Sequence, residues 1–100
     1  GKSVINDRRS LAEYGMLLVL CAVDLETGKI VGDVDIIARG FNLTEDVQAS
    51  IRNATKETVD AADFDKVNVN DVARLVKKAV RKLFYKDRQF PIIIPIIVED

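Results

Sequence analysis

Two long apolar runs near opposite ends of the chain constrain its fold more than any other feature. Residues 16–23 are eight consecutive apolar residues, and residues 92–98 are apolar throughout, with one proline at Pro95. Runs of this length suit strands better than helices. Because no polar residue alternates within them, both strands are expected to carry apolar side chains on both faces. In a sheet with one face in water, the strands need apolar side chains only on the buried face.

A hairpin is expected after the first run. Residues 24–29 combine acidic residues, threonine and glycine, which is turn chemistry, and Gly28 is free to take a positive φ. The return strand, residues 29–38, alternates less regularly. One of its faces is expected to carry four side chains of mixed polarity, namely Val31, Asp33, Asp35 and Ile37.

Two amphipathic helices are expected to follow the hairpin. Thr44 stands before two acidic residues, which is typical of a helix start, and apolar residues at steps of three and four continue to about Ala62. Asn68 or Asn70 is expected to cap the second helix. Its apolar stripe is predicted to comprise Val72, Val76, Ala79, Val80 and Leu83.

The resulting order is β-β-α-α-β, an α+β domain over residues 15–100 preceded by a polar lead-in over residues 1–14. Pro95 cannot donate to a ladder, so the last strand is expected at an edge of the sheet. The first strand, the most apolar, then lies in the centre of a mixed three-stranded sheet of order 2-1-3. The two helices are expected to pack on one face of this sheet.

An apolar sheet face would then lie open to water, and such patches usually mark contacts with partners. The candidate interface residues are Leu18, Leu20, Ile94 and Ile96. The partner could be a second copy, a related subunit or the rest of a longer chain. Alternatively, the polar lead-in folds across this face, or the strands are simply more apolar than the fold requires.

Charge is distributed unevenly along the chain. Residues 41–65 contain two basic and six acidic residues, whereas residues 66–88 contain eight basic and two acidic ones. Five cations of the second helix fall opposite its apolar stripe and are candidate phosphate contacts: Arg74, Lys77, Lys78, Arg81 and Lys82. A basic face of this kind can bind RNA through phosphates. The competing interpretation is a solvated outer face, since no aromatic residue is interleaved for base stacking.

Composition restricts the chemistry available to this chain. It contains no histidine and one cysteine, which excludes histidine-based nucleophile systems, histidine-ligated metals and an internal disulfide. Asp33 with Asp35, and the aspartates of residues 60–65 with Asn68, are weak candidates for cation binding, and turn, capping and edge-strand roles are favoured for them. Cys21 lies within an apolar strand and is expected to be inert core. No catalytic or metal site is predicted.

The chain shows no membrane signal. Its charged N-terminus does not resemble a signal peptide, and no apolar run approaches the roughly 20 residues of a membrane helix. The formal net charge of −1 gives no overall attraction to anionic surfaces. A cytoplasmic location and no membrane partner are expected.

Four segments in register resemble the C-terminal domain of ribonuclease J, a family of bacterial RNA-processing enzymes with a metallo-β-lactamase domain and an inserted β-CASP domain. They are DRRSLAEYG at residues 7–15, RGF at 39–41, LFY at 83–85 and PIIIPII at 91–97. The link at residues 86–90 departs from the family pattern. It is shorter by about one residue and lacks the usual threonine.

The resemblance implies a parent enzyme that cleaves RNA both endonucleolytically and from the 5′ end. That enzyme would use zinc or another divalent metal held by histidine and aspartate motifs. Those motifs are absent here, so no catalytic residue and no cofactor is carried over to this segment. What the resemblance implies for the segment itself is a module that supports subunit assembly and full activity, with RNA bound through the parent enzyme.

Overall fold

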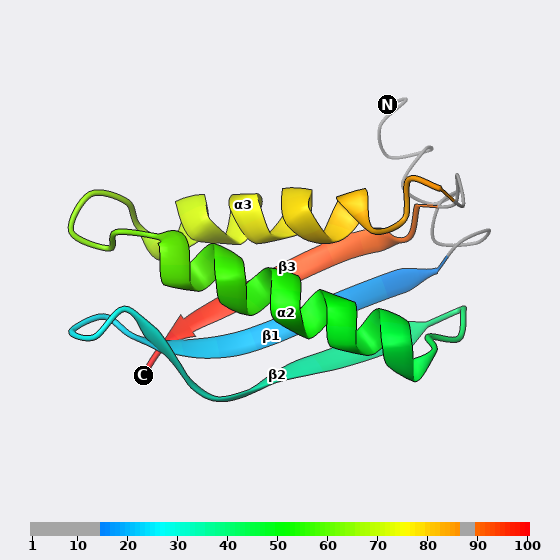
Figure 1. Cartoon of the computed structure of the whole chain (residues 1–100), viewed down its shortest axis with the longest axis horizontal. Coiled ribbons are helices and arrows are strands. Elements are labelled where there is room, and N and C mark those ends of the chain that lie inside the picture. The colour runs from blue at the N-terminus through cyan, green and yellow to red at the C-terminus, as the bar shows by residue number, and fades with distance from the viewer. Residues whose placement is uncertain (1–14, 87–89) are drawn as a thin grey trace.

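The structure, a computed structural model, describes residues 15–86 and 90–100. Within these residues, a three-stranded sheet is covered on one face by two helices (Figure 1). The elements in chain order are β1 (Met16–Asp24), β2 (Lys29–Arg39), α2 (Glu45–Ala61), α3 (Val69–Lys82) and β3 (Ile92–Glu99). The predicted α+β order β-β-α-α-β is confirmed. The predicted lead-in over residues 1–14 lies outside the described residues, as does part of the 86–90 link.

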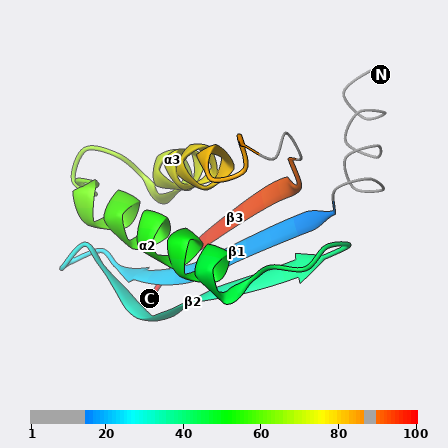
Figure 2. The same cartoon turned by 45° about the vertical axis from the view of Figure 1, so that its right-hand side comes forward.

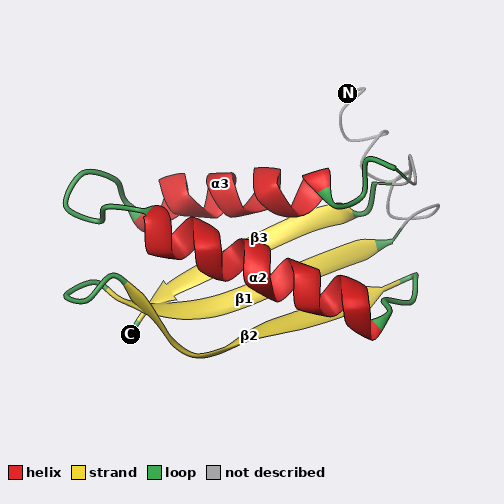
Figure 3. Cartoon of the chain, viewed as in Figure 1, coloured by secondary structure: helices red, strands yellow, loops and turns green. Residues whose placement is uncertain are grey.

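The sheet order is β2-β1-β3, as predicted from the apolar character of the first strand and the proline in the last. β1 pairs antiparallel with β2 and parallel with β3. The two helices return the chain from the β2 edge to the β3 edge, with α2 crossing the sheet and α3 lying over β3 (Figure 3). They are therefore the crossover that parallel pairing of β1 and β3 requires.

The core lies between the helices and one face of the sheet. Along β1, alternate side chains are buried, namely Leu17, Val19, Cys21 and Val23. They pack with buried residues of the two helices, which are Ile51, Val59, Val72, Val76 and Val80. Of the three strands, β1 therefore contributes the most buried apolar side chains to the core, because it is central and faces both helices.

Local sequence signals determine where the helices begin. The Thr44 hydroxyl accepts a hydrogen bond from the backbone amide of Val47 at 3.2 Å, as the predicted cap requires. At α3 the Asn68 side chain accepts from the Asp71 amide at 2.9 Å, and the Asp71 carboxylate accepts from the Asn68 amide at 3.2 Å. This reciprocal capping box shows that Asn68, and not Asn70, is the cap.

Two details of the predicted helix stripes differ in the structure. Thr55, which the apolar pattern omitted, is fully buried in α2, and its hydroxyl donates to the Ile51 carbonyl at 2.8 Å. Leu83, placed in the stripe of α3, is 38% exposed. Phe84, four residues after Val80, continues the row of buried side chains in its place and is 7% exposed.

Backbone hydrogen bonds explain why Pro95 is tolerated in β3. The Ile92 amide donates to the carbonyl of Gly15, the residue before β1, at 2.9 Å. The Asp100 amide donates to the carbonyl of Val23, in β1, also at 2.9 Å. Since amides in a strand alternate in direction, even-numbered positions of β3 face β1 and odd-numbered ones face outward. Pro95 therefore lacks its N–H on the open side of the edge strand, where no ladder bond is lost.

Candidate interaction surfaces

The open face of the sheet brings together the four predicted interface residues. Both helices lie on the opposite face, as the turned view shows (Figure 2). The strand register places Leu18 between Ile37 of β2 and Ile94 of β3. It places Leu20 one row further along, next to Ile96. Leu18, Leu20, Ile94 and Ile96 therefore form a continuous two-by-two block.

Three further residues extend this block, and we call all seven the open-face patch. They are Val31 and Ile37 of β2 and Val98 of β3. The five edge-strand members of the patch are 36–46% exposed, whereas Leu18 and Leu20, in the central strand, are half-buried. The alternation of residues 29–38 already put Val31 and Ile37 on one face. Only the strand register shows that this face is the one that also carries Leu18 and Leu20 of β1.

Two opposite charges on β2 share the open face with the open-face patch. Asp35 lies beside Leu20 and Arg39 beside Met16, so these two β2 residues share the open face with Ile37 between them. Asp33 and Asp35 are both exposed. Asp33 falls in the irregular stretch of β2, where the register shifts between Leu20 and Ala22.

The predicted basic face of α3 is also present. Arg74, Lys77, Lys78, Arg81 and Lys82 are all exposed. Arg74 forms an ion pair with Asp71 at 3.0 Å near the start of the helix, and both side chains are well exposed. Within residues 15–86 and 90–100 it is the only ion pair. The lysines of the face thus form no ion pair with any described carboxylate.

The sequence missed an aromatic group at the end of this basic face. The ring centroids of Tyr85 and Phe90 lie 5.5 Å apart, edge to face, and the Arg81 guanidinium carbon lies 4.9 Å from the centre of the Phe90 ring. Neither aromatic residue is interleaved with the cations of α3 along the chain. The turn after α3 and the start of β3 bring them there.

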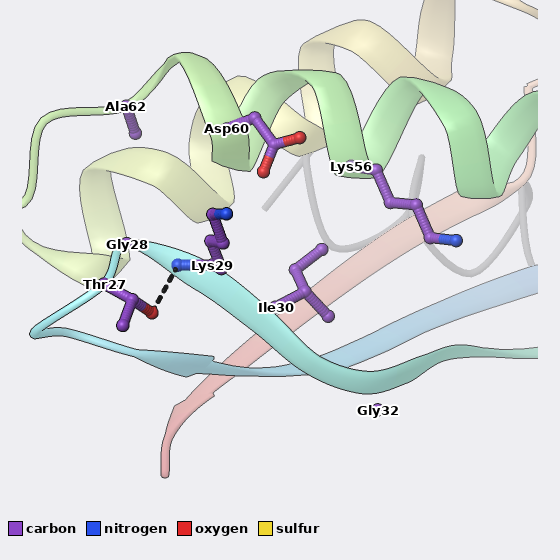
Figure 4. Close-up of a pocket in the computed structure, with 8 residues that line it drawn as sticks. All are labelled: Thr27, Gly28, Lys29, Ile30, Gly32, Lys56, Asp60 and Ala62. Atoms are coloured by element: carbon purple, nitrogen blue, oxygen red, sulfur yellow. Dashed lines mark hydrogen bonds between the residues drawn. The ribbon is translucent and has the colours of Figure 1, made fainter.

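A shallow pocket of about 480 Å³ lies between the β2 end of the hairpin and the last turns of α2 (Figure 4). Its charged lining residues are Lys29, Lys56 and Asp60. The Thr27 hydroxyl accepts a hydrogen bond from the Lys29 amide at 3.3 Å, which is a turn interaction. The pocket brings no nucleophile next to a base, so it offers no arrangement for catalysis.

The remaining polar candidates have structural roles. The Asp63 side chain accepts from the Asp65 amide at 3.0 Å in the turn between the helices. Burial raises the pKa of the Cys21 thiol, which keeps it neutral and unreactive. In the described part of the chain, no three His, Cys, Asp or Glu side chains are grouped to hold a metal ion.

No helix in the described ranges has both the length and the apolar character needed to cross a membrane. The fold and its surfaces define a small α+β domain whose notable features lie on two exposed faces rather than in a cleft. The chain belongs to the ribonuclease J C-terminal domain family, whose model matches residues 3–100. The resemblance found in the four sequence segments is thereby confirmed.

Individual relatives agree with the family match. The chain is 30% identical to Ribonuclease J2 of Bacillus subtilis (strain 168), over 99% of this chain and 19% of that protein. It is 32% identical to Ribonuclease J 1 of Streptococcus pyogenes serotype M3, over 98% of this chain and 18% of that protein. The chain thus spans about a fifth of the length of these relatives.

Proposed function

We propose that this chain is the assembly domain of a longer, cytoplasmic ribonuclease J-like enzyme that processes RNA. Its relatives are about five times as long and are named as ribonucleases, and this chain contains no histidine. The endonucleolytic and 5′-to-3′ exonucleolytic chemistry, with its zinc or other divalent metal, belongs in this proposal to other parts of that polypeptide. The domain supports full activity by holding subunits together.

The observation that carries this proposal is the open-face patch. Seven apolar side chains lie on one sheet face that neither helix covers. Contiguous exposed apolar surface on a domain of this size favours burial against a partner. Two sheets can pack face to face with their inner side chains interdigitated, as in a sandwich.

The flanking charges favour a second copy of this domain as the partner. Asp35 and Arg39 lie on either side of Ile37 on one strand. A two-fold axis along the row through Ile37, Leu18 and Ile94 would place Asp35 of each copy opposite Arg39 of the other. The two charges on either side of this row would then be complementary to those of the second copy, as the interface of a symmetric dimer must be.

Sedimentation velocity over a range of protein concentrations tests this proposal. Ile94→Asp and Ile96→Asp are expected to turn dimers into monomers that keep the wild-type far-ultraviolet circular dichroism spectrum, since both side chains are partly exposed in the single domain. Leu25→Asp is the matched control, because Leu25 is 43% exposed in the hairpin loop, away from the patch.

A charge exchange tests the symmetric arrangement itself. Asp35→Arg and Arg39→Asp are each expected to weaken the dimer, and the double variant is expected to restore it. A wild-type chain that remains monomeric at high concentration would contradict the second copy as partner. Binding of this chain to a separately produced catalytic part, lost in Ile96→Asp, would instead assign the patch to the rest of the polypeptide or a related subunit.

A second candidate function is phosphate contact by the basic face of α3. Its cations are exposed, and most have no described carboxylate partner. Lys77→Glu and Lys78→Glu are expected to weaken RNA binding and to flatten its dependence on salt, because each phosphate contact releases counterions. Lys29→Glu, at the hairpin, is the charge-matched control. Unchanged affinity and salt slope in both α3 variants would remove this candidate.

A further inference from the structure

The turn after α3 presents one aromatic ring outward by anchoring its neighbour inward. Phe84 is 7% exposed and packs edge to face on Phe41, with ring centroids 6.3 Å apart. The amides of Phe84 and Tyr85 donate to the carbonyls of Arg81 and Lys82 at 3.0 and 3.4 Å, which tightens the turn. Tyr85 is consequently held 53% exposed at the end of the basic face.

Phe90 is positioned independently, by the start of β3. Pro91, which follows it, is buried, and the residue before a proline is restricted to extended conformations. The Ile92 amide then donates to the Gly15 carbonyl at 2.9 Å, which ties this entry to β1. The two rings therefore meet because two separately anchored segments converge.

Arg81 connects this aromatic pair to the cations of α3. Its guanidinium lies against the Phe90 ring, while its helical position places it one turn after Lys77, about 6 Å further along the axis. Lys78 and Lys82 form the adjacent row of the same face. The exposed surface thus runs without interruption from cationic side chains to an aromatic platform.

We propose that Arg81, Tyr85 and Phe90 form a base-stacking site for single-stranded RNA, continuous with the lysines of α3. The inference rests on the second candidate function, phosphate contact by that face. Proteins that bind single-stranded nucleic acid without sequence preference combine two features. Cationic side chains contact the phosphate backbone, and aromatic rings stack on the bases. Bases within a duplex are already stacked on one another, so the site should discriminate against double-stranded RNA.

Basic residues in the last turn also stabilise the helix by complementing its negative end. The Arg81–Phe90 contact alone would be consistent with that role. That role does not explain why Tyr85, which lies beside the same ring, is more than half exposed. Stability and RNA affinity therefore have to be measured on the same variants.

The test uses this chain with labelled oligouridylate, oligoadenylate and a duplex of matched length, each titrated over a series of salt concentrations. Tyr85→Ala is expected to weaken single-strand binding about tenfold while leaving the salt slope unchanged. Tyr85→Phe is expected to retain wild-type affinity, because the ring remains. Leu75→Ala, which truncates a side chain that is 50% exposed on the same helix, is the matched control.

Fluorescence gives a direct readout of stacking. The chain has no tryptophan and two tyrosines, Tyr14 and Tyr85, so Tyr14→Phe leaves Tyr85 as the single tyrosine emitter. Saturation with oligouridylate is expected to quench its emission, and the duplex is expected to quench it much less.

The outcomes distinguish base stacking at Tyr85 from phosphate contact by α3. Wild-type affinity in Tyr85→Ala, or unchanged emission at saturation, would overturn the stacking site even if the lysine variants still lose binding. Preference for the duplex would overturn it as well. Loss of neither affinity nor salt slope in the lysine variants would instead refute phosphate contact by α3, and the stacking site with it.

Discussion

Gly15 leaves no room for a side chain beside the carbonyl oxygen of Arg39. A methyl group at this position would overlap that oxygen and would also lie 2.8 Å from the Phe41 ring. Gly15 adopts a φ of 82°, and its carbonyl accepts the hydrogen bond from Ile92 at the start of β3. The start of β1, the end of β2 and the start of β3 lie at the same end of the sheet (Figure 1), and Gly15 contacts residues of the other two strands there.

Gly15→Ala is expected to destabilise the domain by about 2–5 kcal/mol, because the positive φ and the overlap with backbone atoms both oppose a side chain. Gly32→Ala is the matched control. Gly32 has a φ of 73°, and no atom lies within 4 Å of the position that a Cβ would take, so only the cost of a positive φ, about 1–2 kcal/mol, applies. Urea denaturation measures both variants, and equal losses would show that the close approach to Arg39 is unimportant.

Asn68→Ala is expected to lower the free energy of unfolding by about 1–2 kcal/mol, because it removes the cap and half of the capping box at α3. Asn70→Ala, two residues further on and exposed, is expected to stay within about 0.5 kcal/mol of the wild type. Thermal denaturation followed by circular dichroism compares the two. The same loss in both variants would argue against the box.

The buried thiol of Cys21 predicts a loss of stability at alkaline pH. Burial raises the pKa of Cys21, so the folded chain keeps this proton at pH values where the unfolded chain has released it. The thiol's contribution is complete below its ordinary pKa of about 8.5 and declines as the pH rises above that value.

Urea denaturation of the reduced chain between about pH 7 and pH 10 measures this effect against Cys21→Ala, which lacks the titrating group. The variant is expected to be less stable at neutral pH, because it leaves a small cavity in the core. The difference between the two proteins should shrink as the pH rises. Parallel pH profiles would contradict a raised pKa in the folded state.

Most of the fold follows from local sequence signals. The unbroken apolar run at residues 16–23 predicted a central strand, and Pro95 predicted an edge strand, because both constraints act within a single strand. Thr44 as a helix cap is likewise local, since its hydroxyl bonds an amide three residues away. Thr55 escaped the pattern because its polar atom is satisfied by its own helix, which lets a threonine fill an apolar position.

The candidate surfaces were predictable only in part. Leu18, Leu20, Ile94 and Ile96 were expected on one uncovered face, and their placement follows from alternation within two apolar strands. The contribution of Val31, Ile37 and Val98 depends on which residues lie opposite one another, and strand register is a property of the pair. Whether this face binds a second copy stays a prediction.

The sequence by itself determined that both strands of the parallel pair are apolar on two faces, and that α3 carries its cations opposite its apolar stripe. These are consequences of residue type and of the periods of strands and helices. The tertiary structure alone decided that Tyr85 and Phe90 meet beside Arg81, and that Gly15 joins the ends of three strands. Such contacts join separately anchored segments, so they arise from packing and not from any local pattern.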